Sequence, residues 1–294
     1  MARGGCYGVA AHAGSNRAVA GLYPVEVTFP PPAPPVEARI ELPAPYEPAG
    51  RFGIPDVVIG IALFLAVILS SYPIGWWVPI ADPNSFSFWF SLVSYGVIVG
   101  FLVVVTIRRG QRSFARDFSL RFKPIDLAIG LGVGVLAKIL SAIIGVIVFL
   151  VSGSLPEGGN VELGDDKLWA ALTGILIASL LAPFVEELFF RGFVLTAVRN
   201  SVLRRRGAAA SKRAVVIAVL VSSAAFAVMH LQPVFDPILL IVLGLSTFTF
   251  GVLNALITLL TRRIGAAIVA HIVFNGSSVA LLLLFGDQLQ GLMP

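Results

Sequence analysis

The sequence predicts an all-α, polytopic transmembrane helix bundle, and its composition and long apolar runs are the observations that predict it. Of the 294 residues, 57% are hydrophobic and only 13% are charged, whereas soluble domains carry about 25% charged residues. Mean hydropathy is +0.92. A helix needs about 20 apolar residues to cross the hydrocarbon core. We therefore expect about seven spans, or eight if one long run hides a second crossing, after a disordered N-terminal arm.

The arm is residues 1–50. Its stretch "TFPPPAPPVEARIELPAPYEPAG" is rich in Pro and Ala and has neither helical nor strand periodicity, which is typical of flexible, polyproline-like chain. It lacks the apolar core and cleavage site of a signal peptide. The single cysteine, Cys6, excludes an internal disulfide and a cysteine-based metal site. We expect a disordered cytoplasmic arm at 1–50 and a transmembrane domain at 51–294.

Seven apolar runs follow the arm in order. The third and fourth are longer than a simple span requires, and the third either begins at the membrane interface or contains an extra crossing. Within it, "GLGVG" (130–134) has no preceding strand, so we expect close helix packing rather than a glycine loop. The runs are Ile54–Ser71, Phe88–Ile107, Ile125–Ser152, Leu168 to about Val198, Ala214–Leu231, Pro237–Leu260 and Ile264–Phe285.

The loops between the runs alternate in charge. Residues 108–123 and 199–213 each hold six Lys or Arg, whereas the opposite set of loops holds only Lys167. The positive-inside rule then predicts a cytoplasmic N-terminus and an external C-terminus. The net charge of +5 is thus a belt at the lipid surface, with the bilayer as partner, and not a nucleic-acid patch. The Ala, Gly, Arg and Pro content favours a GC-rich bacterial source, so we expect an integral protein of a bacterial cell membrane.

The stretch "LAPFVEELFFRGFVL" (181–195) places Glu186, Glu187 and Arg191 inside an apolar run. Each charge at the centre of a membrane helix costs about 2.5–3.5 kcal/mol on insertion scales. Glu187 and Arg191 are i,i+4 neighbours and can pair, whereas Glu186 is rotated by about 100° and lacks a local cation. Pro183 removes a helical hydrogen bond and should loosen the backbone, which membrane proteins tolerate where it lines a wet cavity.

Two later runs add polar groups at helical spacing. "FAVMH" places Phe226 and His230 at i,i+4, and "HIVFN" does the same for His271 and Asn275. A carboxylate beside an imidazole can take a proton from water, and an imidazole with a carboxamide can stabilise an oxyanion, so the set suits hydrolysis. The same side chains could ligate a metal, although the HExxH pairing of zinc peptidases is absent. Each group alone is also compatible with helix packing.

"EELFFR", "FAVMH" and "HIVFN" resemble the EExxxR, FxxxH and HxxxN motifs of the CAAX-processing and bacteriocin-processing (CPBP, or Abi) intramembrane proteases. The motifs occur in family order on separate helices, within a core of about 168–285. The resemblance implies that Glu186 activates water with His230, and that His271 and Asn275 stabilise the oxyanion. Glu187, Arg191 and Phe226 then have supporting roles. We expect no metal cofactor; the alternative is zinc, held by Glu186, His230 and His271.

The function we expect is an intramembrane endopeptidase acting on a membrane protein or peptide, lipidated or not, from a wet cavity that opens to the cytoplasm. Counting residues places Glu186 in the cytoplasmic third but His230 near the outer face, so we expect "LQPVFDP" to be a turn tucked inside the bundle. One rival is a non-catalytic CPBP-like binding or immunity protein. The other is a proton-coupled transporter, against which the lack of an internal repeat counts.

Overall fold

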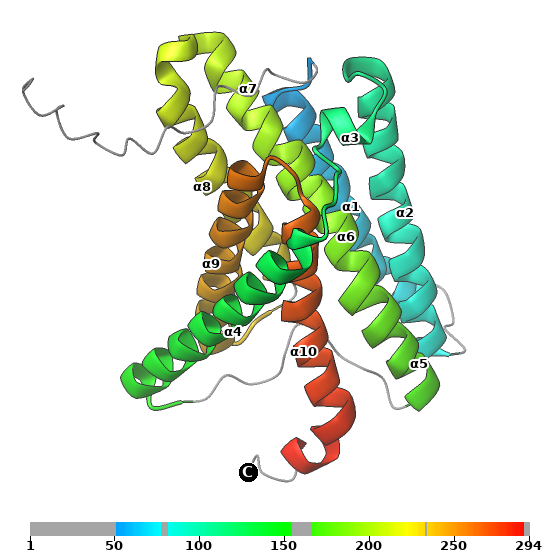
Figure 1. Cartoon of the computed structure of the whole chain (residues 1–294). Helices are drawn as coiled ribbons and strands as arrows, with labels where there is room; N and C mark the ends of the chain where they lie inside the picture. The colour runs from blue at the N-terminus through cyan, green and yellow to red at the C-terminus, as the bar shows by residue number, and fades with distance from the viewer. Residues whose placement is uncertain (1–50, 78–81, 155–165, 233, 291–294) are drawn as a thin grey trace, which may run out of the picture. The chain divides into compact units, whose positions relative to one another are not determined.

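A computed structural model describes residues 51–77, 82–154, 166–232 and 234–290, and every regular element in these ranges is a helix (Figure 1). The predicted all-α class is therefore confirmed for the described part of the chain. The prediction for the arm at 1–50 lies outside the described residues.

The helices follow one another with short connections. Asp166 and Asp236 cap two of them, because each carboxylate accepts hydrogen bonds from backbone N–H groups of the following first turn. Gly153 and Gly207 end two others with positive φ values of 71° and 72°. The bounds are α1 Ile54–Trp77, α2 Pro83–Arg109, α3 Phe114–Asp117, α4 Ile125–Ser152, α5 Lys167–Ala171, α6 Ala182–Glu187, α7 Leu195–Arg206, α8 Ser211–His230, α9 Pro237–Thr261 and α10 Gly265–Gln290.

Six helices of the described part are long and apolar enough to cross a membrane. They correspond to the second to seventh predicted runs, and the chain is a multi-pass integral membrane protein. The first run lies in α1, whose described apolar part, Ile54–Ser70, is shorter than the other six. The third run is one unbroken helix of 28 residues, so it contains no eighth crossing.

The fourth run forms a single helical rod, Lys167–Arg206, of 40 residues. Two π-helical segments, η1 (Leu172–Leu181) and η2 (Leu188–Val194), flank the short α6 that carries Glu186 and Glu187. The backbone is therefore loosened on both sides of the two carboxylates. Such π-helical turns are frequent at functional sites.

The two ends of the helix bundle differ in charge. In Figure 1, α1, α4, α8 and α10 begin at their upper ends, and α2, α7 and α9 finish at theirs. We call this the basic end, because the Arg- and Lys-rich loops join the helices there. There Arg109 pairs with Asp56 at 3.3 Å and Arg263 with Asp126 at 2.6 Å. The hydrogen bond to Asp126 raises the pKa of Arg263. At the opposite, low-charge end, Lys167 is the only Lys or Arg of the described residues.

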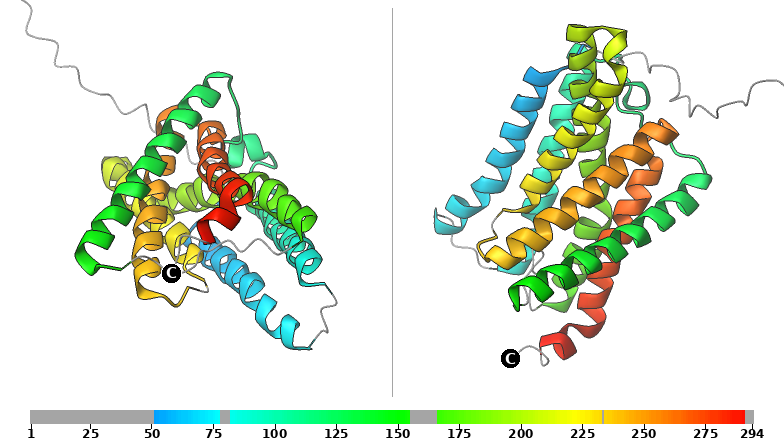
Figure 2. Two further views of the ribbon diagram at one scale, coloured as in Figure 1. Left: turned by 90° about the horizontal axis from the view of Figure 1, so that it is seen from below. Right: turned by 90° about the vertical axis from the view of Figure 1, so that its left-hand side faces the viewer.

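α4 crosses α9 and α10 and packs against both (Figure 2). A Cβ on Gly134 would lie 2.8 Å from the Ala270 carbonyl oxygen, and one on Gly130 would also collide with α10, whereas Gly132 faces open space. The predicted role of this glycine run in helix packing is confirmed. It fixes the stretch of α10 that carries His271.

Candidate active site

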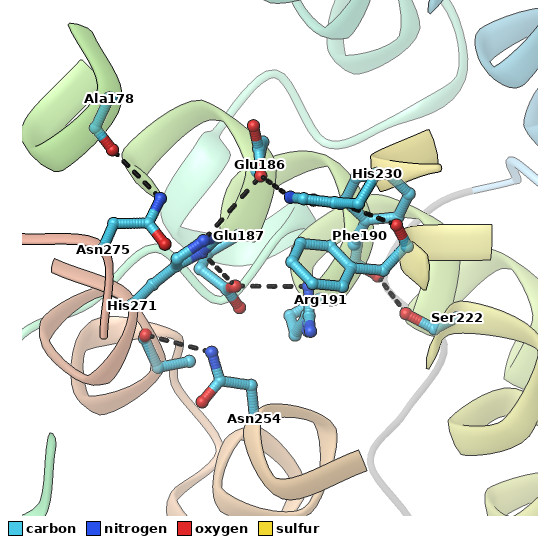
Figure 3. Close-up of polar contacts among 12 residues, drawn as sticks. Ala178, Glu186, Glu187, Phe190, Arg191, Ser222, His230, Asn254, His271 and Asn275 are labelled. Carbon is cyan, nitrogen blue, oxygen red and sulfur yellow. Dashed lines mark hydrogen bonds and ion pairs between the residues drawn. The ribbon is translucent and has the colours of Figure 1, made fainter. Parts of the chain in front are cut away.

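Glu186 is the meeting point of the polar side chains (Figure 3). Its Oε2 atom lies 3.5 Å from His230 Nε2 and 3.8 Å from His271 Nε2. The carboxylate projects from α6, His230 is the last residue of α8, and His271 lies near the start of α10. The structure thus brings together three groups from helices that are distant in sequence.

Hydrogen bonds orient both imidazole rings. His230 Nδ1 lies 2.8 Å from the Phe226 carbonyl oxygen, and because a carbonyl can only accept, Nδ1 carries the hydrogen. Nε2 then faces Glu186 Oε2 at 3.5 Å, so a water that lies beside the two atoms can contact both of them. The geometry at Glu186 therefore suits a bridging water.

Glu187 is buried and serves a different purpose from its neighbour. Its Oε1 atom lies 3.2 Å from Arg191 Nη1, so the predicted i,i+4 ion pair forms. The same oxygen lies 2.8 Å from His271 Nδ1, a contact that sequence spacing could not reveal. Because Nδ1 is held at Glu187, Nε2 on the other side of the ring faces Glu186. Glu187 therefore links the arginine to the second histidine.

Phe226 joins the same cluster through its ring. Its centroid lies 4.2 Å from that of His230 and 5.5 Å from that of His271, and the Arg191 guanidinium carbon lies 4.3 Å from it. A cation over an aromatic face is stabilised by the ring quadrupole. The aromatic residue of the FxxxH pattern thus packs against both imidazoles and the buried cation.

Asn275 donates a 3.0 Å hydrogen bond from Nδ2 to the Ala178 carbonyl oxygen. In this π-helical stretch, the Ala182 N–H donates to the carbonyl oxygen of Ile177, five residues earlier. The N–H of residue 183 would therefore donate to the Ala178 carbonyl oxygen. That position is Pro183, which has no N–H. Asn275 therefore supplies the donor that the proline removes. Asn275 also lines the cavity described below, and the second hydrogen of its side-chain amide can donate to a ligand there.

Tyr95 is a member of the site that sequence reasoning missed. Its hydroxyl donates a 2.8 Å hydrogen bond to Glu186 Oε1 from α2, a helix without a recognised motif. The available signal was a tyrosine in the middle of an apolar run, since a buried tyrosine hydroxyl usually has a partner. Tyr95 holds one carboxylate oxygen and leaves Oε2 to face the histidines.

A cavity of about 680 Å³ adjoins these groups. It includes Glu186, His271 and Asn275 deep in the bundle and reaches Phe86 and Gln232 at the low-charge end. Sequence reasoning combined a cytoplasmic basic end with a cavity opening to the cytoplasm. These two expectations exclude one another, because the cavity extends away from the basic end.

The depth mismatch expected for His230 comes from a misplaced helix end. The sequence prediction ended the fourth run near Val198, but the helix continues to Arg206. Measured from the basic end, Glu186 is 20 residues from Arg206, about 30 Å, and His230 is 19 residues from Ser211, about 28 Å. The two residues therefore lie level on antiparallel neighbours, and no tucked turn is needed to bring them together.

Glu186, His230 and His271 are also the ligand set expected for zinc. A zinc ion needs nitrogen and oxygen ligands at about 2.0–2.2 Å. Among the described residues, no group of three or more His, Cys, Asp or Glu side chains is arranged to hold a metal ion.

Comparison with protein families gives one match. Residues 168–277 match the family described as type II CAAX prenyl endopeptidase Rce1-like. The chain carries an Rce1-like domain. This agrees with the resemblance to the CPBP proteases, and the Rce1-like domain contains Glu186, Glu187, Arg191, His230, His271 and Asn275. Tyr95 and the first four helices lie outside it. Neither a curated protein nor a solved structure matches the chain.

Proposed function

We propose that the protein is an intramembrane endopeptidase that hydrolyses a peptide bond of a membrane-associated protein or peptide. One observation carries the proposal: Glu186 Oε2 faces the Nε2 atoms of His230 and His271 at 3.5 and 3.8 Å beside a large intramembrane cavity. These separations suit a shared water. The Rce1-like domain, whose family name denotes endopeptidases, supports the same reaction.

Glu186 is the general base. Glu187 is committed to Arg191 and His271, whereas Glu186 Oε2 has no hydrogen-bond partner among the described residues. A water beside Glu186 Oε2 and His230 Nε2 contacts both atoms and donates a hydrogen to Glu186. As the water oxygen adds to the scissile carbonyl carbon, its proton moves to Glu186.

His271 and Asn275 stabilise the oxyanion that this addition creates. This role requires a hydrogen on both ring nitrogens of His271, so that Nδ1 bonds to Glu187 and Nε2 donates toward the oxyanion. The second amide hydrogen of Asn275, one helical turn further along α10, adds another donor. The intermediate then collapses: the C–N bond breaks, and Glu186 returns the proton to the leaving amine.

The cavity walls support a substrate that arrives from the membrane. They combine apolar side chains of α1, α2 and α9 with the polar groups named above. A peptide in extended form, with or without a lipid group, is compatible with such a lining. We propose a membrane protein or peptide as substrate, lipidated or not.

The proposed reaction uses no metal ion. Activity should survive prolonged treatment with a chelator, and added zinc should not increase it. Loss of activity on chelation, with recovery on stoichiometric zinc, would make Glu186, His230 and His271 metal ligands instead.

The proposed orientation places the basic end in the cytoplasm of a bacterial cell, so that the cavity faces the outer side. In a Cys6→Ser background, a membrane-impermeant maleimide added to intact cells should label Ser154→Cys at the low-charge end and spare Lys212→Cys at the basic end. The reverse pattern would overturn the orientation and leave the chemistry unaffected.

The decisive experiment compares wild type with Glu186→Gln, reconstituted in liposomes with N-myristoylated dodecapeptides of mixed sequence. Mass spectrometry should detect cleavage by wild type and a fall of about 10²–10⁴-fold for the variant. Ser277→Ala, at an exposed residue outside the cavity lining whose hydroxyl donates to the Phe274 carbonyl oxygen of its own helix, should cleave normally. No cleavage by wild type, with biological activity retained by Glu186→Gln, would favour a non-catalytic binding protein.

A further inference from the structure

Asn254 is a buried polar residue that the proposed chemistry does not use. It lies on α9, is fully buried, and belongs to none of the three recognised motifs. Asparagine side chains inside membrane helices commonly hydrogen-bond to a neighbouring helix. Asn254 is not part of the cavity lining. Any effect that it has on the reaction must therefore pass through another residue.

The Asn254 amide holds the turn of α10 that carries His271. Its Nδ2 atom donates a 3.2 Å hydrogen bond to the Ala267 carbonyl oxygen (Figure 3). In an α-helix each carbonyl accepts from the N–H four residues later, so the Ala267 carbonyl is also the partner of the His271 N–H. A carbonyl oxygen has two lone pairs and can accept from both donors. Asn254 therefore bonds to the same acceptor that fixes the His271 backbone.

A second contact from the same helix reaches the ring of His271. Phe250 lies one turn before Asn254 on α9, and its ring centroid is 4.8 Å from that of His271. The imidazole itself has Nδ1 at Glu187 and Nε2 facing Glu186. α9 thus contacts His271 at two places, the backbone through Asn254 and the ring through Phe250.

Stability does not account for an asparagine at this position. Its Oδ1 atom is buried and has no hydrogen-bond partner among the described residues, and an unsatisfied buried acceptor is destabilising. A leucine has a similar branched shape and would bury no polar group. It would leave no unpaired carbonyl on α10 either, because the Ala267 oxygen keeps its bond to the His271 N–H. The asparagine therefore calls for a role in function.

We propose that Asn254 is a positioning residue for the reaction. This inference rests on the proposed function, in which His271 donates to the oxyanion. An oxyanion donor must lie close to the place where the charge develops, and a shift of about 1 Å can cost about 10²-fold in rate. By tying the first turns of α10 to α9, Asn254 keeps the His271 ring in place. It acts on the rate of the chemical step and not on substrate binding.

The test compares the full-length wild type with Asn254→Leu in liposomes, with the N-myristoylated dodecapeptides as substrates. Asn254→Leu should lower kcat about three- to tenfold, the effect of one neutral hydrogen bond, and leave KM unchanged. Its Tm in detergent should equal or exceed that of wild type, because a buried unpaired acceptor is removed. If leucine prevents folding, Asn254→Ala gives the same comparison of kcat and KM.

Thr258→Val is the matched control. Thr258 is one turn further along α9 and buried, and its hydroxyl has no hydrogen-bond partner in the described structure. The substitution keeps the shape of the side chain and removes only the hydroxyl. Thr258→Val should therefore keep the wild-type kcat.

A double variant shows whether the effect passes through His271. In the His271→Gln background, Asn254→Leu should cause no further loss of the residual kcat. An equal loss in both backgrounds would overturn the proposal, as would a wild-type kcat for both Asn254→Leu and Asn254→Ala. A loss of folded protein that accounts for the lower rate would also overturn it.

A spectroscopic measurement separates this proposal from the proposed function. In protein labelled with ¹⁵N-histidine, with signals assigned by His271→Gln, Asn254→Leu should shift or broaden the ring signals of His271 and leave those of His230 in place. This change without any cleavage by wild type would refute the peptidase reaction alone. Unchanged His271 signals in Asn254→Leu would refute the positioning role.

Discussion

The Glu187 carboxylate accepts a 2.8 Å hydrogen bond from His271 Nδ1. Glu187 also pairs with Arg191 in the next helical turn. The buried Glu187 carboxylate therefore contacts both the Arg191 guanidinium and the His271 ring, which faces the cavity. The neighbouring Glu186, rotated around the same helix, reaches the cavity itself. Two adjacent carboxylates thus have separate roles, and mutations should separate them.

Glu187→Gln should reduce both stability and activity, whereas Glu186→Gln should reduce mainly activity. Removing Glu187 leaves the Arg191 charge buried and unpaired, which costs about 3–5 kcal/mol. Glu186 has no ion pair shorter than 3.5 Å in the described structure, so Glu186→Gln leaves no buried cation unpaired and should lower the free energy of unfolding by less than Glu187→Gln does. Chemical denaturation in detergent and peptide cleavage measure the two effects. Equal stability losses in both variants would contradict this division of roles.

The Glu187–Arg191 pair should behave as a coupled unit. Arg191→Met alone should cost about 3–5 kcal/mol, because it leaves the Glu187 charge buried. The double variant Glu187→Gln/Arg191→Met removes both charges and should be more stable than either single variant, with a coupling energy above about 1 kcal/mol. Its activity should stay low, since His271 keeps only a neutral partner. Additive stability losses would show that the pair contributes little.

Tyr95→Phe should lower kcat about tenfold or more, because a hydrogen bond to a charged group contributes about 1.5–3 kcal/mol. The phenol is the only donor to Glu186 Oε1 in the described structure, and without it the carboxylate can rotate away from the histidines. Single-turnover cleavage would measure the effect. Tyr95→Phe with wild-type kcat would show that the rings alone position Glu186.

The sequence was sufficient to predict the helical class and the helices that carry the polar motifs, because apolar runs and i,i+4 spacing are local properties. It also predicted the Glu187–Arg191 pair, which lies within one helix. It could not predict that His271 joins this pair, or that Tyr95 reaches Glu186, because both contacts depend on how distant helices pack. The combination of a cytoplasmic basic end with a cavity open to the cytoplasm is inconsistent for a similar reason: the polar stretch 199–206 continues the helix and changes the level of Glu186.

Gly134→Ala and Gly132→Ala make a matched pair two residues apart on α4. A Cβ on Gly134 would come 2.8 Å from the Ala270 carbonyl oxygen, whereas one on Gly132 meets nothing within 4 Å. Gly134→Ala should therefore push α10 away, lower thermal stability and reduce cleavage through His271. Gly132→Ala should be neutral or stabilising by up to about 1 kcal/mol from helix propensity. Similar thermal stabilities for both variants would argue against close packing of α4 on α10.

The link between Asn275 and Pro183 can be tested by restoring the missing backbone donor. Asn275→Ala leaves the Ala178 carbonyl without its 3.0 Å hydrogen bond, and a buried unsatisfied carbonyl costs about 1–3 kcal/mol. Pro183→Ala restores a backbone N–H at residue 183. In the π-helical hydrogen-bond pattern, this N–H can donate to the Ala178 carbonyl oxygen. In the Pro183→Ala background, Asn275→Ala should therefore cost less stability, by at least about 1 kcal/mol. Activity should not recover in the double variant, because the proposed oxyanion donor is still missing. An equal loss of stability from Asn275→Ala in both backgrounds would show that the amide does not replace the missing N–H of Pro183. Cleavage by the double variant at the wild-type rate would show that Asn275 only bonds to the Ala178 carbonyl and does not stabilise the oxyanion.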